Sequence, residues 1–411
     1  MSTGALAALI LTAGAVASFA QDACADVDGQ TALYTKFTGL YNKKTVTDME
    51  SALAAGKEFL EKFGACESLK EQVDFVRPHV ERIEKALPGV RKAGTLSPLF
   101  KRFDAAIIAD NGDEIYASGR EILALDPDNI NIIVPLGVAG LYQSYNNNPK
   151  YAEDTIRYAK LALDKLKGGM AATKKNKAGV DVYGALKYEF TKEQAIDELS
   201  YSVANLTFYA KKDKKGALPL YYEIAQGNGK YKDDPRVYQT IGSHFGSEVI
   251  RLAGEVKKLI DEQKAKATDE EKLAMEPKIK EAIGLLNGTA ERAMEYYSRA
   301  YKLAKATTPA EKTYRDGLYK DLTILYEGRF NKKDGLDAYI SSVSAKPLPN
   351  PTTPVTPVLD PEPTTTTTSA PASAKPAASA PASAKPAAAV TTKPLSTIPV
   401  KAGVAKKGTR K

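Results

Sequence analysis

Few residues in this 411-residue chain have the type and spacing that chemistry requires. The two histidines, His79 and His244, are far apart in sequence, and neither has a second ligand at the spacing of a metal site, so we expect both to be structural or exposed. Residues 226–230 lack the spacing of a phosphate-binding loop, and residues 110–114 resemble a calcium-binding loop only in composition. We therefore predict a non-enzymatic protein with no catalytic residue, metal or cofactor.

The N-terminal segment predicts the compartment. Residues 5–17 form a mostly apolar run, and Ser18-Phe19-Ala20 ends it with small residues where a signal peptidase cleaves. This pattern predicts a signal peptide over residues 1–20 and export across the inner membrane, to the periplasm or another part of the cell envelope. Because no Lys or Arg precedes the run, a buried N-terminal helix or a misassigned start codon is the alternative.

The chain has two cysteines, Cys24 and Cys66. Neither lies in a Cys-x-x-Cys pair, which argues against redox catalysis. An oxidising compartment would join them in a disulfide that ties the N-terminal segment to the end of the first helical hairpin. The alternative is two unpaired structural thiols.

The net charge of +8 is concentrated near the C-terminus. Residues 346–411 contain nine basic and two acidic residues, a net charge of +7, which leaves +1 for the rest of the chain. Pro, Thr, Ala and Ser dominate there, and residues 369–378 repeat identically at 379–388. Such a segment has too little apolar bulk to fold, so we predict a disordered tail over residues 346–411. The tail has no aromatic residue for bases to stack on, and this, together with export, argues against nucleic acid as a partner.

Between residues 32 and 346 the apolar positions recur at helical spacing almost throughout. Capping boxes or an N-terminal proline mark helix starts after Thr191, Thr268 and Thr308. No apolar run is long enough to span a bilayer, so we expect no transmembrane segment in the mature chain. These features predict an all-α body over residues 21–345.

The predicted helices repeat. One spacing places a large residue, a small or apolar pair and an aromatic residue on a first helix, then a small, a large and an apolar residue on a second. Clear copies begin at Tyr34, Ile133, Tyr201, Tyr238 and Tyr319, and a weaker copy includes Ala106 and Ile115. Small residues such as Ala217 and Gly242 would let two antiparallel helices approach, and neighbouring hairpins would have to stack to bury enough apolar surface.

This spacing, together with Leu-Ala-Leu-Asp-Pro-Asp-Asn at residues 123–129, resembles the tetratricopeptide repeat family. The resemblance covers roughly residues 31–349 as six divergent copies, two of them 34 residues long, and implies a solenoid of helical hairpins. The chain would be an exported bacterial member with a basic tail rich in Pro, Ala and Thr. One first helix departs from the pattern with Arg102 at an expected apolar position, and an irregular helical solenoid is the alternative.

Insertions interrupt the predicted repeats near residues 67–95 and 246–288. The first contains an amphipathic helix that we expect Pro78 to interrupt, and the second a long charged pair of helices. The lysine-rich residues 165–187 are predicted to form a mobile loop.

In the tetratricopeptide repeat family, a peptide typically lies in a concave groove lined by the first helix of each repeat. Carried over to this chain, the resemblance implies that the groove is lined by Asn131, Val138, Ser202, Leu206, Tyr209, Arg236, Gln239, Ser243, Lys320 and Ile324. Their amides, hydroxyls and apolar groups suit an extended peptide. The lysine and asparagine set with which some members clamp a C-terminal carboxylate is not matched.

The leading hypothesis is therefore an envelope scaffold that binds a protein or peptide in this groove. The second is an envelope tether whose basic tail binds an anionic cell-wall or membrane polymer, with salt-sensitive affinity. The third, an enzyme whose site is formed by the insertions, has no residue to recommend it.

Overall fold

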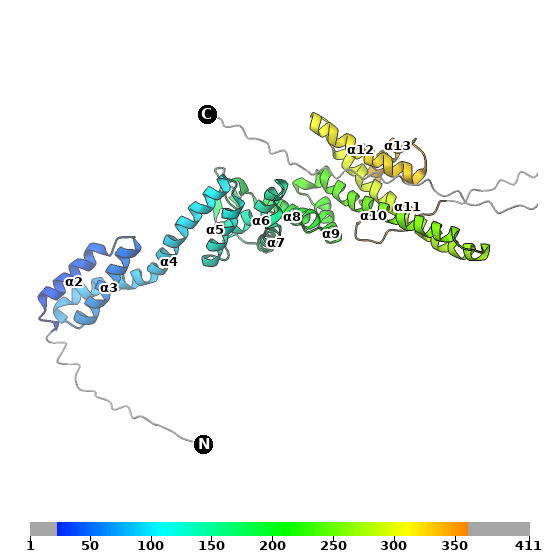
Figure 1. Ribbon diagram of the computed structural model, residues 1–411. Coiled ribbons are helices and arrows are strands. Elements are labelled where there is room, and N and C mark those ends of the chain that lie inside the picture. Colours follow the sequence, from blue (N-terminus) through cyan, green and yellow to red (C-terminus); the bar gives the residue numbers. More distant parts are fainter. Residues whose placement is uncertain (1–22, 361–411) are drawn as a thin grey trace, which may run out of the picture. The chain divides into compact units, whose positions relative to one another are not determined.

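The structure is a computed structural model that describes residues 23–360 (Figure 1). Helices occupy most of this range, and the strands within it are the short antiparallel pair β1 (Lys174–Lys175) and β2 (Asp181–Val182), which confirms the predicted all-α fold. Contacts divide the described residues into two units, 23–127 and 128–360. The predicted signal peptide (residues 1–20) and the tail beyond residue 360 lie outside the described residues.

The first unit consists of α2 (Val27–Leu40), α3 (Val46–Phe63), α4 (Lys70–Ile108) and α5 (Gly112–Leu125), with a 3₁₀ turn at Glu67–Leu69 before α4. Helices α2, α3 and the first part of α4 enclose a core that includes Phe37, Phe59 and Phe63. A disulfide joins Cys24 to Cys66, whose Cα atoms are 5.6 Å apart. It ties the segment before α2 to the residue that follows the α2–α3 hairpin.

Helix α4 shows that the predicted interruption at Pro78 is wrong. The helix continues through Pro78, Pro88 and Pro98. Each proline removes one backbone hydrogen bond, but all three are exposed, so water can reach the carbonyl that each one frees. The opposite face is buried at helical spacing by Val73, Val76, Val80, Ile83 and Leu87. Burial of this apolar face against α2 and α3 keeps the helix intact.

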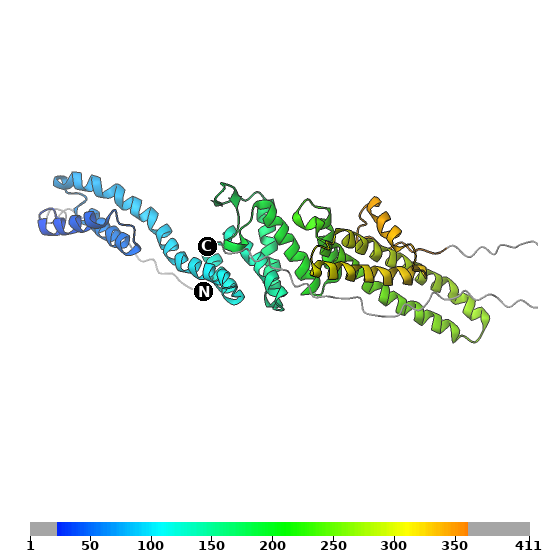
Figure 2. The same ribbon diagram turned by 90° about the horizontal axis from the view of Figure 1, so that it is seen from above.

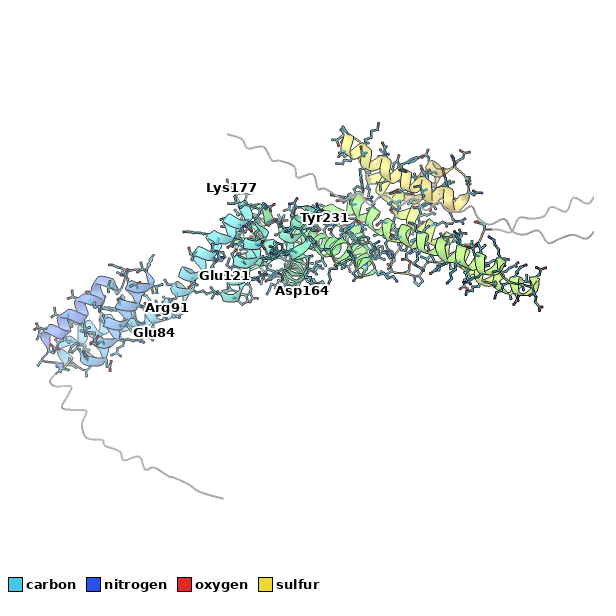
Figure 3. The ribbon with its side chains drawn as sticks, in the orientation of Figure 1. Glu84, Arg91, Glu121, Asp164, Lys177 and Tyr231 are labelled. Carbon is cyan, nitrogen blue, oxygen red and sulfur yellow. A yellow bond between two sulfur atoms is a disulfide. The ribbon has the colours of Figure 1, made fainter. Side chains whose placement is uncertain are left out.

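Ion pairs join α4 to its neighbours (Figure 3). Arg91 pairs with Glu50 of α3 at 2.6 Å. Arg102, which stands where an apolar residue was expected, pairs with Glu114 at 2.7 Å and Glu121 at 2.9 Å on α5. All of these side chains are solvent-accessible, so each pair adds specificity of pairing more than stability.

The second unit contains successive helical hairpins (Figure 2). They are α6 (Ile130–Tyr145) with α7 (Ala152–Lys167), α8 (Lys192–Tyr209) with α9 (Lys214–Gln226), α10 (Pro235–Lys264) with α11 (Asp269–Leu303), and α12 (Pro309–Phe330) with α13 (Leu336–Ser342). Each hairpin coincides with one predicted copy of the repeat. The capping boxes at Thr191, Thr268 and Thr308 are present.

Close approach within the α10–α11 hairpin depends on a glycine. A Cβ added at Gly242 would lie 2.9 Å from the ring of Tyr297, so only glycine fits without a shift of that ring. The insertion predicted near residues 246–288 is the extension of both helices beyond this point, joined by residues 265–268. Its prediction as a charged helical pair is confirmed.

The lysine-rich segment differs from the irregular loop expected for residues 165–187. It contains the β1–β2 pair and a 3₁₀ turn at Leu186–Tyr188. Lys174 pairs with Glu189, and Lys175 pairs with Asp181, each at 2.6 Å. These two lysines therefore form local ion pairs.

The predicted start of the tail is also wrong. Residues 346–360, which we name the strap, run along α11 without helix or strand and turn once at residues 351–353. Composition alone predicted disorder for this segment, because proline and threonine do not form a hydrophobic core. Its partners are polar groups and glycines of α11, which the composition of the strap itself does not reveal.

Candidate functional site

The ten predicted groove residues lie on the first helices of the hairpins in the second unit. They are Asn131 and Val138 on α6, Ser202, Leu206 and Tyr209 on α8, Arg236, Gln239 and Ser243 on α10, and Lys320 and Ile324 on α12. Most of them lie in one of three environments: the core, the support of a neighbouring loop, and one polar cluster; Ser243 bonds within α10 to the carbonyl of Thr240, and Lys320 and Ile324 lie apart on α12.

Three of the predicted positions are wrong as groove-lining residues. Val138, Ser202 and Leu206 have no exposed surface. Helices α6 and α8 pack against each other as well as against α7, so a position that faces outward in a single hairpin is covered here. Ser202 completes its hydrogen bonding within the helix by donating to the carbonyl of Glu198.

Asn131 supports the lysine-rich segment. Its side-chain nitrogen donates to the hydroxyl of Thr173 at 2.7 Å, and its oxygen accepts the backbone N–H of Gly184 at 3.1 Å. On α12, Lys320 is exposed and Ile324 is half-buried. Both follow Tyr314, the residue of this helix that bonds to Gln239 of α10.

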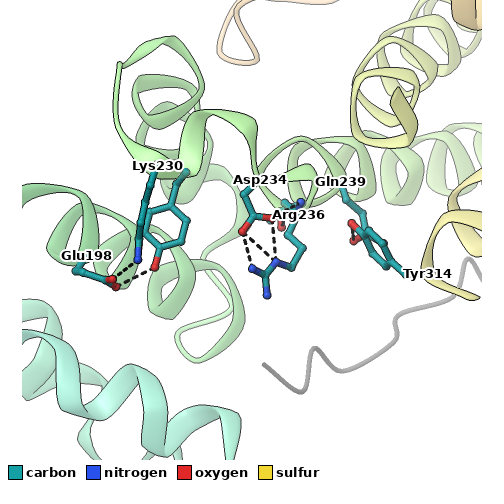
Figure 4. Close-up of polar contacts among 8 residues, drawn as sticks. Glu198, Lys230, Asp234, Arg236, Gln239 and Tyr314 are labelled. Carbon is teal, nitrogen blue, oxygen red and sulfur yellow. Dashed lines mark hydrogen bonds and ion pairs between the residues drawn. The ribbon is translucent and has the colours of Figure 1, made fainter. Parts of the chain in front are cut away.

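Arg236 is the centre of the polar cluster (Figure 4). Its Nε donates to Asp234 Oδ1 at 2.9 Å and its Nη2 to Asp234 Oδ2 at 2.6 Å. Asp234 also caps the N-terminus of α10 by accepting the backbone N–H of Arg236. This hydrogen bonding with Asp234 raises the pKa of Arg236, so the guanidinium is charged and fixed in direction.

Tyrosines from three helices lie within electrostatic range of this guanidinium. Arg236 acts electrostatically on Tyr145 of α6, Tyr201 and Tyr209 of α8, and Tyr314 of α12. Burial raises the pKa of all four phenols, that of Tyr145 to about 12, so each stays neutral at physiological pH. We name these four tyrosines, Arg236 and Gln239 the Arg236 face.

Two hydrogen bonds orient the outer part of the Arg236 face. The hydroxyl of Tyr209 shares a hydrogen bond with Thr240 at 3.1 Å, while 49% of the residue stays exposed. The hydroxyl of Tyr314 donates to Gln239 Oε1 at 2.9 Å, which links α12 to α10. The structure thus brings together Tyr209, Arg236 and Gln239 of the predicted groove.

Glu198 is a buried carboxylate that the sequence reasoning missed. It is 3% exposed, and it accepts hydrogen bonds from the ammonium of Lys230 and, at 2.8 Å, from the hydroxyl of Tyr231. Its burial could have been predicted from the helical period, since an acid three residues before the core residue Tyr201 falls on the buried face of the helix. The ring of Tyr231 stacks on Tyr201 at 4.1 Å between centroids.

The turn at residues 226–230 carries Lys230 to Glu198. Helix α9 ends at Gln226, and a 3₁₀ turn begins at Lys230. The backbone N–H of Lys230 donates to Asp197 at 2.9 Å. A Cβ at Gly229 would lie 1.8 Å from the same carboxylate, so a larger residue there would displace the side chain of Asp197.

A cleft of about 450 Å³ lies on the other side of α8, among α7, α8 and α9. Its lining mixes charged residues, including Asp164 and Asp197, with apolar ones such as Leu220 and Ile224. Tyr231 lines this cleft and also bonds to Glu198, so it connects the cleft with the buried carboxylate of α8.

Both histidines lie in packed surroundings. The Nδ1–H of His79 donates to the carbonyl of Phe75, 2.8 Å away, and the ring packs on those of Phe75 and Tyr41. His244 is buried beside Phe245, and burial lowers its pKa. Over residues 23–360, no three His, Cys, Asp or Glu side chains gather closely enough to hold a metal ion.

The chain matches no protein-family model, no curated protein and no solved structure. Membership of the tetratricopeptide repeat family therefore stays a prediction. Within the described part of the chain, none of the helices combines the length and apolar character of a membrane span.

Proposed function

We propose that this chain is a non-enzymatic scaffold of the cell envelope that binds a partner protein through an extended segment laid on the Arg236 face. The observation that carries the proposal is the polar cluster in which Asp234 holds the guanidinium of Arg236, while hydrogen bonds to α10 orient Tyr209 of α8 and Tyr314 of α12. Tyr and Arg are the residue types that contribute most to protein–protein affinity, because they combine large contact areas with hydrogen bonding.

The chemistry of the Arg236 face fits a peptide main chain. Asp234 accepts hydrogen bonds from Nε and Nη2 of Arg236. The N–H groups of Nη1 can therefore donate to a carbonyl or carboxylate of a ligand. The phenol of Tyr209 is exposed beside it. Peptide recognition of this kind needs no residue to change protonation state.

Export is part of the proposal and gains support from the disulfide. Cys24 and Cys66 are joined, and disulfides persist mainly in oxidising compartments such as the periplasm. The similarity of the hairpins to tetratricopeptide repeats supports a scaffold role, because stacked hairpins present extended surfaces for partners.

The test is site-specific photo-crosslinking in intact cells. A photoreactive amino acid at Tyr209 should give a discrete crosslinked protein, whereas the same amino acid at Leu273 on α11, which is 63% exposed, should not give that product. Addition of Arg236→Ala should weaken the crosslink. An identical product from both positions, or an undiminished product with Arg236→Ala, would remove the Arg236 face from the function.

One observation favours the tether as a second candidate. The strap is fixed to α11, so anything bound beyond residue 360 would be connected directly to the folded unit. Residues 361–411 carry eight basic residues and one acid. Binding of anionic polymer by the full chain should then fall steeply with salt and with removal of these charges, while the Tyr209 crosslink persists.

A further inference from the structure

The strap is held on α11 mainly through its main-chain carbonyls. Arg299 donates to the carbonyls of Lys346, at 2.8 Å, and Pro347, at 3.0 Å. Arg292 donates to that of Asn350 at 2.9 Å, and Tyr296 donates to that of Pro349. A weaker contact of 3.5 Å joins Tyr222 of α9 to the carbonyl of Leu348. Five successive carbonyls, 346 to 350, thus meet side-chain donors.

The second half of the strap is bound by backbone and glycine contacts. The backbone N–H of Val358 donates to the carbonyl of Gly284 at 2.8 Å, and Asn287 donates to the carbonyl of Val358 at 3.1 Å. A Cβ at Gly288 would lie 2.2 Å from the carbonyl oxygen of Thr356. The glycines of α11 therefore let the strap backbone approach the helix directly.

The end of the strap is fixed by a buried cation. Arg329 of α12 pairs with Asp360 at 2.9 Å and with Glu291 of α11 at 2.8 Å. The side chain of Arg329 is 3% exposed, whereas that of Asp360 is 65% exposed. The pair thus connects the strap to both helices at the point where the described residues end.

These contacts match the chemistry of a proline-rich segment. The strap has prolines at 347, 349, 351, 354 and 357, none of which has an N–H to donate. Such a segment has many carbonyl acceptors and few donors. Helix α11 supplies the complementary donors from arginine, tyrosine and asparagine side chains. Proline also pre-orders the extended conformation, which lowers the entropic cost of binding.

We propose that residues 284–299 of α11, with Tyr222 of α9, form a second peptide-binding site for proline-rich segments. We name it the strap face. Its occupant is residues 346–360 of the same chain, which make the contacts described above. The proposal goes beyond the Arg236 face, which lies on other helices and whose partner is a different protein. Within one chain the short connection from α13 to the strap favours the internal occupant through its high effective concentration.

The test frees the strap face without shortening the chain. Residues 346–360 are replaced by a Gly-Ser sequence of equal length in the full chain, and a fluorescent peptide of residues 346–360 is titrated in. Saturable binding at least tenfold tighter than to the unaltered chain is expected, because the unaltered strap competes. No saturable binding, or equal affinity for both chains, would overturn the proposal.

Two further arms locate and characterise the site. In the Gly-Ser chain, Arg299→Ala should weaken peptide binding at least tenfold, whereas Arg251→Ala, which removes an arginine paired with Glu248 and Glu255 on α10, should leave it unchanged. A peptide with all five prolines changed to alanine should bind at least tenfold more weakly. Equal loss from both arginine variants, or equal binding of the alanine peptide, would refute main-chain recognition of proline-rich segments on α11.

Discussion

The Arg236 face and the strap face use similar side chains in opposite ways. On the strap face, Arg292 and Arg299 donate to carbonyls of a separate segment. On the Arg236 face, Arg236 is paired with Asp234 two residues away, and Tyr314 donates to Gln239. One face is completed by an incoming chain, and the other is completed by its own residues.

This difference determines how each face behaves without a ligand. On the strap face, donors of α11 are bonded to carbonyls of the strap, so removal of the strap would exchange these hydrogen bonds for bonds to water. On the Arg236 face, Asp234 already orients the guanidinium and leaves its Nη1 for a ligand. This face can therefore stand open and exchange partners with little rearrangement.

The largest expected effect comes from Gly288→Ala. The added methyl group would meet the carbonyl oxygen of Thr356, a backbone atom that cannot move aside, so the strap should lift from α11. Hydrogen exchange at the amide of Val358, which donates to the carbonyl of Gly284, should accelerate by about 100-fold or more, equivalent to about 2.7 kcal/mol. Alanine favours helix by about 1 kcal/mol over glycine, so α11 itself should persist.

Gly254→Ala is the matched control. An added Cβ at this helical position of α10 has open space around it. The same gain in helix propensity should leave exchange at Val358 unchanged. Slow exchange in the Gly288→Ala chain would mean that the strap does not depend on close approach at that glycine, and the contrast between the two faces would weaken.

The next largest effect is expected from Arg236→Ala on partner binding. Loss of a charge-assisted hydrogen bond to the ligand should lower affinity by about 10- to 100-fold, which a titration with the identified partner would measure. The free energy of unfolding should change by less than about 1 kcal/mol, because Asp234 can still cap α10 through the backbone N–H of residue 236. Arg251→Ala, on the same helix, should preserve affinity; a similar loss there would point to general charge attraction.

Much of the fold could be predicted because it rests on local rules. The capping boxes at Thr191, Thr268 and Thr308 mark real helix starts, and Gly242 does let α10 approach α11. These features depend on neighbours three or four residues away, or on one facing helix. Their signature is therefore contained in a short stretch of sequence.

The site could be predicted only in part, because burial depends on how hairpins pack. Tyr209, Arg236 and Gln239 were predicted and do come together. Val138 and Leu206 were predicted by the same spacing but are covered by neighbouring helices. The strap could not be predicted because the residues that bind it are on α11, far away in sequence. A proline-rich segment is also predicted to be disordered when its binding partner is not known.

A smaller effect is expected from Glu198→Gln, which tests how far the Arg236 face depends on its interior. The change removes the charge that Lys230 and Tyr231 bond to inside the fold. Because Lys230 is half-exposed, its share is screened, and the unfolding free energy should fall by about 1–2 kcal/mol in urea denaturation. Glu193→Gln, an exposed position on the same helix, should change it by less than about 0.5 kcal/mol.

The smallest effect should appear in the pH dependence of stability, through His244 on the helix that carries Arg236. Burial lowers the pKa of His244, so near pH 6.5 and below the unfolded chain binds a proton that the folded chain does not. Stability should therefore fall as the pH drops from 8 to 5.5, with a slope of at most about 1.4 kcal/mol per pH unit from this one group.

Two variants isolate this contribution of His244. His244→Asn should flatten the slope between pH 8 and 5.5 in urea denaturation at fixed salt. Glu248→Gln should steepen it, because the carboxylate of Glu248 raises the pKa of His244 and its removal leaves burial less opposed. The carboxyl group of Glu248 itself titrates below this range: burial raises its pKa, but the Arg251 hydrogen bond together with the positive charges of Arg251, His244 and Lys215 lowers it overall. An unchanged slope in His244→Asn would show that other groups set the acid limit of α10, and that the helix under the Arg236 face does not respond to mild acid through its histidine.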